Sequence, residues 1–105
     1  MSALIWCPFP DRDSARAAAQ TLLNEKLGAC VNLLGPIESI FDWQGERSSA
    51  AEIGVLFKTD EGLLDRAITR LEVLHPYDTP AILGWRCDSA AGATRAWLGL
   101  LGQGD

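Results

Sequence analysis

The sequence predicts a single α+β domain, with four strands and two helices in the order β-α-β-β-α-β and a short C-terminal helix. Two observations support this prediction. Apolar residues recur at helical spacing in two long segments, and four other segments are short apolar runs bounded by proline, glycine or aspartate. The 105 residues suffice for one domain with its own core, so residues 1–105 are expected to form one unit.

The first half of the chain predicts a strand, a helix and a long second strand. Residues 3–9 form an apolar run that ends among prolines, which indicates a strand. Asp11 or Asp13 can cap the helix that follows, and Gly28 stands where a left-handed residue would end it. Residues 29–41 predict a long strand, and its internal glycine-proline pair implies a bulge or an edge position.

The second half predicts a hairpin, a helix and a fourth strand. Residues 42–46 have the composition of a hairpin tip, and residues 51–59 alternate as a third strand. Asp60 can cap the second helix, whose apolar stripe continues until a proline stops it. Residues 79–87 then predict a fourth strand, and residues 92–101 a terminal helix.

This element order is the split βαβ arrangement of ferredoxin-like domains, in which two helices cover one face of a four-stranded antiparallel sheet. The first strand nevertheless carries apolar residues at both parities, with Leu4 and Trp6 set against Ile5 and Cys7. The face without helices would therefore expose a larger apolar patch than monomers usually do. We expect another copy of the chain to cover it.

Composition excludes several classes of protein. The net charge is −5 and only two lysines are present, which argues against nucleic acid as the main partner. No apolar stretch is long enough to span a bilayer, and nothing at the N-terminus indicates export. Three cysteines without a CxxC spacing make a disulfide framework unfavourable, so a cytoplasmic location is expected.

Residues 74–80, Leu-His-Pro-Tyr-Asp-Thr-Pro, are the segment richest in chemistry. His75, the only histidine, and Cys7 are candidate metal ligands, with Asp78 as a possible third. A thiolate with an imidazole suits Cu(I) or Zn(II), while Cu(II) also accepts imidazole and carboxylate. Structural alternatives remain for each residue: a helix-terminal histidine held by carbonyls, a small buried thiol, and a carboxylate bonded to turn amides.

A candidate intersubunit pocket involves two aromatic and three charged residues. Trp43 and Tyr77 could line it or serve only in interface packing, where aromatic residues are enriched. Glu38 and Lys58 lie on adjacent predicted strands and could be a cross-strand pair or pocket groups, and Asp78 would join them from the loop.

Four segments of the sequence together resemble the CutA1 family, the divalent-cation tolerance proteins. They are Cys7 shortly before a Pro-Asp pair, Lys-Leu-Gly-Ala-Cys-Val-Asn at 26–32, Ile-Glu-Ser-Ile-Phe-Asp-Trp-Gln-Gly at 37–45, and residues 74–80. They occur in order and at the family's spacing, and the resemblance covers nearly the whole chain, from about residue 4 to residue 98.

The resemblance implies a ferredoxin-like protomer, a tight homotrimer, and a role in tolerance of divalent metals, mainly copper. It implies Cu(II) or another divalent cation as the ligand, bound at positions that match Cys7 and His75. It implies no settled enzymatic reaction. The sequence departs from the family pattern near the proposed binding region at Leu74, Glu46 and Ala81.

Two other functions compete with this one. The first is a small-molecule-responsive regulatory trimer similar to the PII proteins, although the chain lacks the glycine-rich, basic loops of a nucleotide site. The second is an enzyme with Cys7 as nucleophile and His75 as base, which would require the two side chains to lie within hydrogen-bond reach. No oxyanion-hole motif is present, and we expect no enzymatic activity.

Overall fold

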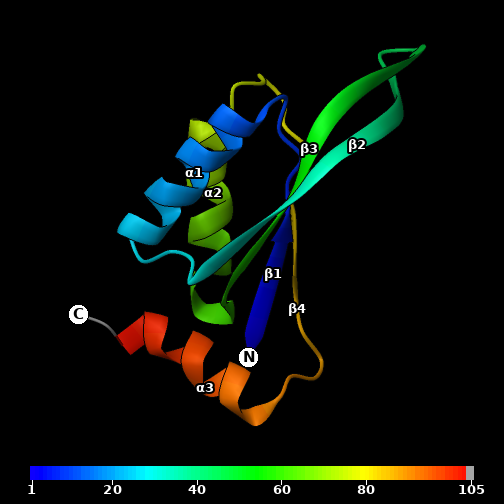
Figure 1. Cartoon of the computed structure of the whole chain (residues 1–105). Coiled ribbons are helices and arrows are strands. Elements are labelled where there is room, and N and C mark those ends of the chain that lie inside the picture. The colour runs from blue at the N-terminus through cyan, green and yellow to red at the C-terminus, as the bar shows by residue number, and fades with distance from the viewer. Residues whose placement is uncertain (104–105) are drawn as a thin grey trace.

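Two helices lie side by side on one face of a four-stranded antiparallel sheet (Figure 1), which confirms the predicted ferredoxin-like class. The computed structural model describes residues 1–103, and the strand order is β2-β3-β1-β4. Within these residues, no helix has the length and apolar character needed to cross a bilayer. The elements are β1 (Ser2–Trp6), α1 (Arg12–Asn24), β2 (Cys30–Trp43), β3 (Glu46–Asp60), the 3-10 turn η1 (Glu61–Leu63), α2 (Leu64–Leu74), β4 (Leu83–Arg86), α3 (Gly92–Gly99) and the 3-10 turn η2 (Leu100–Gln103).

The core lies between the sheet and the two helices. Successive strand side chains point to opposite sides of the sheet, so residues of one parity face α1 and α2. These residues are buried. Apolar residues at helical spacing on α1 and α2 meet them. The largest buried side chains of this layer are Ile5, Phe9, Leu22, Phe57 and Leu71.

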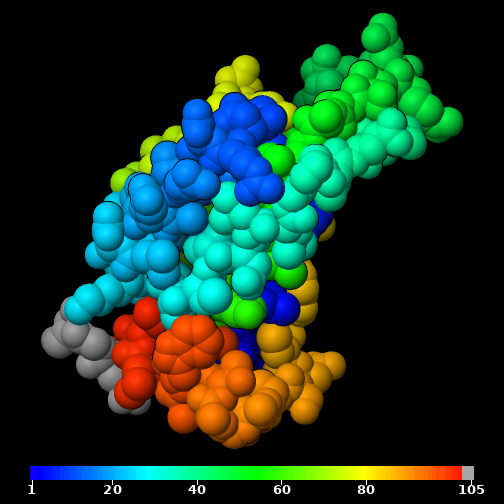
Figure 2. Space-filling view, in the orientation of Figure 1, coloured from blue at the N-terminus to red at the C-terminus, as the bar shows by residue number. Residues whose placement is uncertain are grey.

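Strands β2 and β3 extend beyond the body as a two-stranded arm, which we define as residues 36–53 (Figures 1 and 2). The predicted tip is confirmed, since Gln44 and Gly45 both have positive φ, as a two-residue hairpin turn requires. The third strand starts earlier than predicted, at Glu46, because that turn returns the chain straight into the ladder. Asp42 and Arg47 form a two-point ion pair beside the tip, with Nε–Oδ1 and Nη2–Oδ2 distances of 2.8 and 3.1 Å.

Prolines shorten two of the predicted strands. Strand β1 ends at Trp6 rather than residue 9, and beyond it only Phe9 makes a bridge, to Ile53. Strand β4 begins at Leu83 rather than residue 79. Both lost segments contain a proline, which has no N–H to donate to a ladder. The bulge expected from the glycine-proline pair is confirmed, because the β2–β3 register shifts between Leu33 and Pro36.

The end of α1 also differs from the prediction. Lys26, with φ of 59°, takes the left-handed position that was expected of Gly28. The amide N–H groups of Lys26 and Leu27 donate to the carbonyls of Leu23 and Leu22, which is a Schellman motif that ends the helix two residues earlier than predicted. The start of α1 is as predicted, since the Asp11 carboxylate accepts from the Ser14 amide at 2.7 Å.

The sheet face opposite the helices, here called the open face, is apolar as predicted. Leu4, Trp6 and Leu56 are only partly covered, and Leu83 and Trp85 remain 65% and 44% exposed. The open face is defined by these five residues, which occupy one parity of β1, β3 and β4.

Trp6 lies directly over Gly54, so we expect Gly54→Ala to destabilise the fold. A methyl group on residue 54 would stand 2.6 Å from Cη2 of the indole, a rigid ring that must then move as a whole. Such overpacking costs about 1–3 kcal/mol of unfolding free energy. Urea unfolding at one fixed protomer concentration measures the cost. Gly99→Ala is the control, because nothing lies within 4 Å of its added methyl group, and an unfolding midpoint of Gly54→Ala equal to that of the unmodified chain would contradict the expectation.

Candidate functional site

The His75 ring is buried where α2 ends, with 6% of the residue exposed. It stacks on the Phe9 ring at a centroid distance of 4.4 Å and an interplanar angle of 26°. The Tyr77 ring lies against it at 4.8 Å. The imidazole therefore contacts one aromatic ring from the segment after β1 and one from the connector, here defined as residues 75–82 between α2 and β4.

Both ring nitrogens of His75 make hydrogen bonds. Nε2 donates to the carbonyl oxygen of Pro8 at 2.8 Å, and Nδ1 accepts from the backbone N–H of Tyr77 at 3.1 Å. A carbonyl oxygen only accepts and an amide N–H only donates, so these partners specify a neutral ring with its proton on Nε2. The structural alternative was a helix-terminal histidine held by carbonyls. One of the two partners is a carbonyl, but it belongs to Pro8, just past the end of β1, and not to α2.

The Cys7 thiol is fully buried in the same region. Burial, and secondarily the negative charge of Glu52, raises its pKa to about 12. The thiol therefore keeps its proton at neutral pH, whereas a metal ligand or a nucleophile acts as the thiolate. Cys7 immediately precedes Pro8, whose backbone carbonyl accepts from the His75 ring, so the backbone at Cys7 lies one residue from that contact.

These donors do not fit a metal ion as they stand. The thiol is protonated, and each imidazole nitrogen already has a partner. Among residues 1–103, no three His, Cys, Asp or Glu side chains are grouped so that they could hold a metal. Ligation by Cys7 and His75 stays a prediction, and within one chain it requires breaking a His75 hydrogen bond and removing the Cys7 proton.

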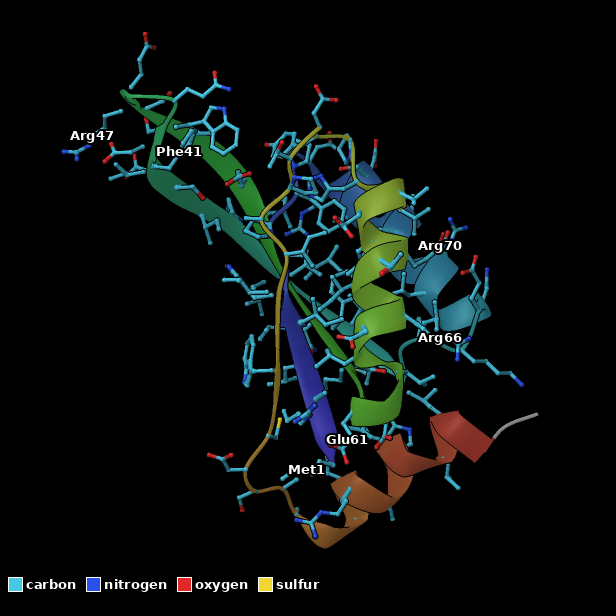
Figure 3. All side chains as sticks on the ribbon, turned by 180° about the vertical axis from the view of Figure 1, so that it is seen from behind. Met1, Phe41, Arg47, Glu61, Arg66 and Arg70 are labelled. Atoms are coloured by element: carbon cyan, nitrogen blue, oxygen red, sulfur yellow. The ribbon has the colours of Figure 1, made fainter. Side chains whose placement is uncertain are left out.

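A groove of about 700 Å³ lies between the arm and the connector. Phe41, on the arm wall, is labelled in Figure 3. Tyr77, on the connector, donates its hydroxyl proton to Glu52 Oε2 at 3.0 Å, and burial together with this carboxylate raises the Tyr77 pKa to about 12. The lining residues are Pro8, Ser39, Phe41, Asp42, Trp43, Gln44, Glu52 and 77–81.

Three of the five residues predicted for a pocket line this groove: Trp43, Tyr77 and Asp78. Asp78 is exposed and has no hydrogen-bond or ion-pair partner among the described residues, so the expected bonds to turn amides are absent there. The cross-strand pairing of Glu38 and Lys58 was wrong. The ladder sets Glu38 opposite Ala51 and Lys58 opposite Cys30, so the two residues are seven positions apart along β3, and neither lines the groove.

Sequence reasoning missed Glu52 and Phe41, which both line the groove. No motif in the sequence singled out Glu52, because it stands in an apolar strand, opposite Ile37. Only the register of β2 against β3, which follows from the tip and the bulge, places it below the connector. A signal existed in the alternation of β3, where Glu52 has the parity of the open face.

Comparison with known proteins gives consistent matches over most of the chain. A family model described as CutA1 divalent ion tolerance protein matches residues 3–100. The chain is 36% identical over 95 residues to the divalent-cation tolerance protein CutA of Pyrococcus horikoshii, which covers 90% of this chain and 92% of that protein. It is 29% identical over 97 residues to the chloroplastic protein CutA of Arabidopsis thaliana, covering 92% of this chain but only 53% of that protein.

Solved structures of similar proteins share the fold. CutA of Xylella fastidiosa superimposes with a TM-score of 0.90 at 33% identity, covering 95% of this chain and 96% of that chain. The periplasmic divalent cation tolerance protein CutA of Archaeoglobus fulgidus also gives a TM-score of 0.90, at 29% identity, covering 96% of this chain and 98% of that chain.

The raised pKa of Cys7 predicts slow alkylation. In a Cys30→Ser/Cys87→Ser chain, iodoacetamide should label native Cys7 about a thousandfold more slowly at neutral pH than it labels the same chain in urea. The thiolate fraction falls tenfold for each unit by which the pKa rises, here from 9.0 to about 12. Mass spectrometry of the digested protein measures the rate, and native labelling as fast as unfolded labelling would contradict the buried, protonated thiol.

Proposed function

Because the chain belongs to the CutA1 family of divalent ion tolerance proteins, we propose that it acts in the tolerance of divalent metal cations. The observation that carries this proposal is the family match, which extends over residues 3–100. It is supported by relatives that are themselves named divalent-cation tolerance proteins. Nothing in the comparisons favours the alternative of a small-molecule regulatory trimer.

The proposed working form is a homotrimer. The open face supports assembly, because Leu83 and Trp85 leave large apolar surfaces in water that another copy can cover. The arm supports it as well, since an isolated two-stranded ribbon is only marginally stable without packing on its faces. Ile40, at 67% exposure, and Trp43, at 53%, are apolar surfaces on that ribbon.

The proposed ligand is a divalent cation, with copper as the first candidate and Cys7 and His75 as its ligands. The hydrogen bond from the His75 ring to Pro8, the residue after Cys7, supports the pair, while the protonated thiol and the two hydrogen bonds of the imidazole oppose binding by one chain in this conformation. A complete ligand set therefore needs donors from more than one copy. The assembly and the metal role are linked in this proposal, because oligomerisation brings further side chains to each site.

We propose no catalytic step for this protein, and we propose that it is located in the cytoplasm. A thiol whose pKa is raised to about 12 is a poor nucleophile, which disfavours an enzyme based on Cys7. Three free cysteines are consistent with a reducing compartment. The related proteins described above as chloroplastic and periplasmic are the alternatives that localisation of this chain must exclude.

A charge placed on the open face should separate the copies. We expect Trp85→Glu to sediment as a monomer where the unmodified chain sediments as a trimer, because an unpaired carboxylate in an apolar interface costs several kcal/mol. Val73→Glu is the matched control: Val73 is 72% exposed on α2, in the helix layer rather than on the open face. Analytical ultracentrifugation decides the matter, and a Trp85→Glu trimer would remove the open face from the interface.

Copper binding should depend on that assembly. In calorimetric titrations with Cu(II), we expect the Trp85→Glu monomer and His75→Ala each to bind at least about tenfold more weakly than the unmodified chain, since loss of metal-site residues typically costs this much. Val73→Glu should bind normally. Equal affinity in His75→Ala would eliminate His75 as a ligand, and full affinity in the monomer would eliminate a shared site.

A further inference from the structure

The groove between the arm and the connector has a lining unlike that of a metal site. Three aromatic residues stand on its two walls: Phe41 and Trp43 on the arm, and Tyr77 on the connector. Three carboxylates accompany them, and no lysine, arginine or histidine is among the lining residues. The carboxylates belong to Asp42, Glu52 and Asp78.

Two of these carboxylates lack a compensating cation. Asp42 is paired with Arg47, at distances of 2.8 and 3.1 Å. Glu52 has only the neutral Tyr77 hydroxyl as its partner, and Asp78 has no hydrogen-bond or ion-pair partner within residues 1–103.

The size of the groove and its aromatic walls determine what kind of cation would be complementary. Its volume of about 700 Å³ lies in the range of small-molecule sites and far exceeds that of a single metal ion. Aromatic rings attract cations through the negative charge of their faces, and they also pack against apolar groups. In the single chain, Phe41, Trp43 and Tyr77 are each between 39% and 53% exposed.

We propose that this groove binds a small organic cation, an ammonium group carried on an apolar body. Glu52 and Asp78 supply the opposite charge from the base and the rim, while Phe41, Trp43 and Tyr77 contact the body on both sides. The negative lining disfavours anionic ligands such as nucleotides. Neither Cys7 nor His75 lines the groove, although two lining residues, Pro8 and Tyr77, contact the His75 ring.

Choline and its neutral isostere 3,3-dimethylbutanol test the proposal, because they match in shape and differ in charge. Each is titrated into the assembled, ¹⁵N-labelled protein, and the indole N–H signal of Trp43 is followed by NMR. We expect choline to shift this signal and to bind at least about threefold more tightly than the isostere. Glu52→Gln should remove most of that difference, whereas Glu46→Gln, an equal charge change on the arm outside the lining, should retain it.

Each other result overturns the proposal. If choline does not shift the Trp43 signal, the groove takes no such cation, and a second copy filling it would give this result. If the two probes bind equally, apolar contact alone explains binding. If Glu46→Gln weakens binding as much as Glu52→Gln, the effect comes from net charge rather than from the groove. Copper titration is independent of all three results, so failure here leaves the metal role standing.

Discussion

The two hydrogen bonds of the His75 ring join three parts of the chain: the segment after β1, the end of α2 and the connector. One reaches the Pro8 carbonyl at the end of β1, the other the Tyr77 amide in the connector, and the residue itself ends α2. Loss of a buried partner costs about 1–3 kcal/mol for each group left unsatisfied. The connector carries one wall of the groove and leads into β4, so the position of both depends on this ring.

Glu52 gives the same region its electrostatic character. Its carboxylate accepts a hydrogen bond from the Tyr77 hydroxyl, and its negative charge adds to the effect of burial in raising the pKa of the Cys7 thiol. Burial and, secondarily, this one carboxylate raise the pKa of both the Tyr77 phenol and the Cys7 thiol. The interior of this region therefore holds neutral groups, the Cys7 thiol and the His75 imidazole, whereas the groove carries negative charge. This division explains why cation binding is expected at the groove surface, whereas metal ligation at Cys7 and His75 requires a change of state.

Local patterns predicted much of this fold. Helical spacing located α1 and α2, a glycine at the tip located the arm, and strand parity identified the open face. One error was at the end of α1, where Lys26 has the left-handed conformation that was predicted for the glycine two residues later. The partners of His75 and Tyr77 lie 67 and 25 residues away, and no periodicity in one sequence specifies such pairs. Glu52 lines the groove because of the register between β2 and β3, which no local pattern specifies.

The proton of the His75 ring provides the most direct test of this account. As the only histidine in the sequence, His75 gives ring ¹H–¹⁵N correlations that need no assignment by mutation. In the metal-free protein at neutral pH, the account predicts a proton on Nε2 and an unprotonated Nδ1 that accepts the Tyr77 amide. A proton on Nδ1 would contradict it, because Nδ1 could then not accept the Tyr77 amide N–H, and a ring with its only proton on Nδ1 would also be unable to donate to the Pro8 carbonyl.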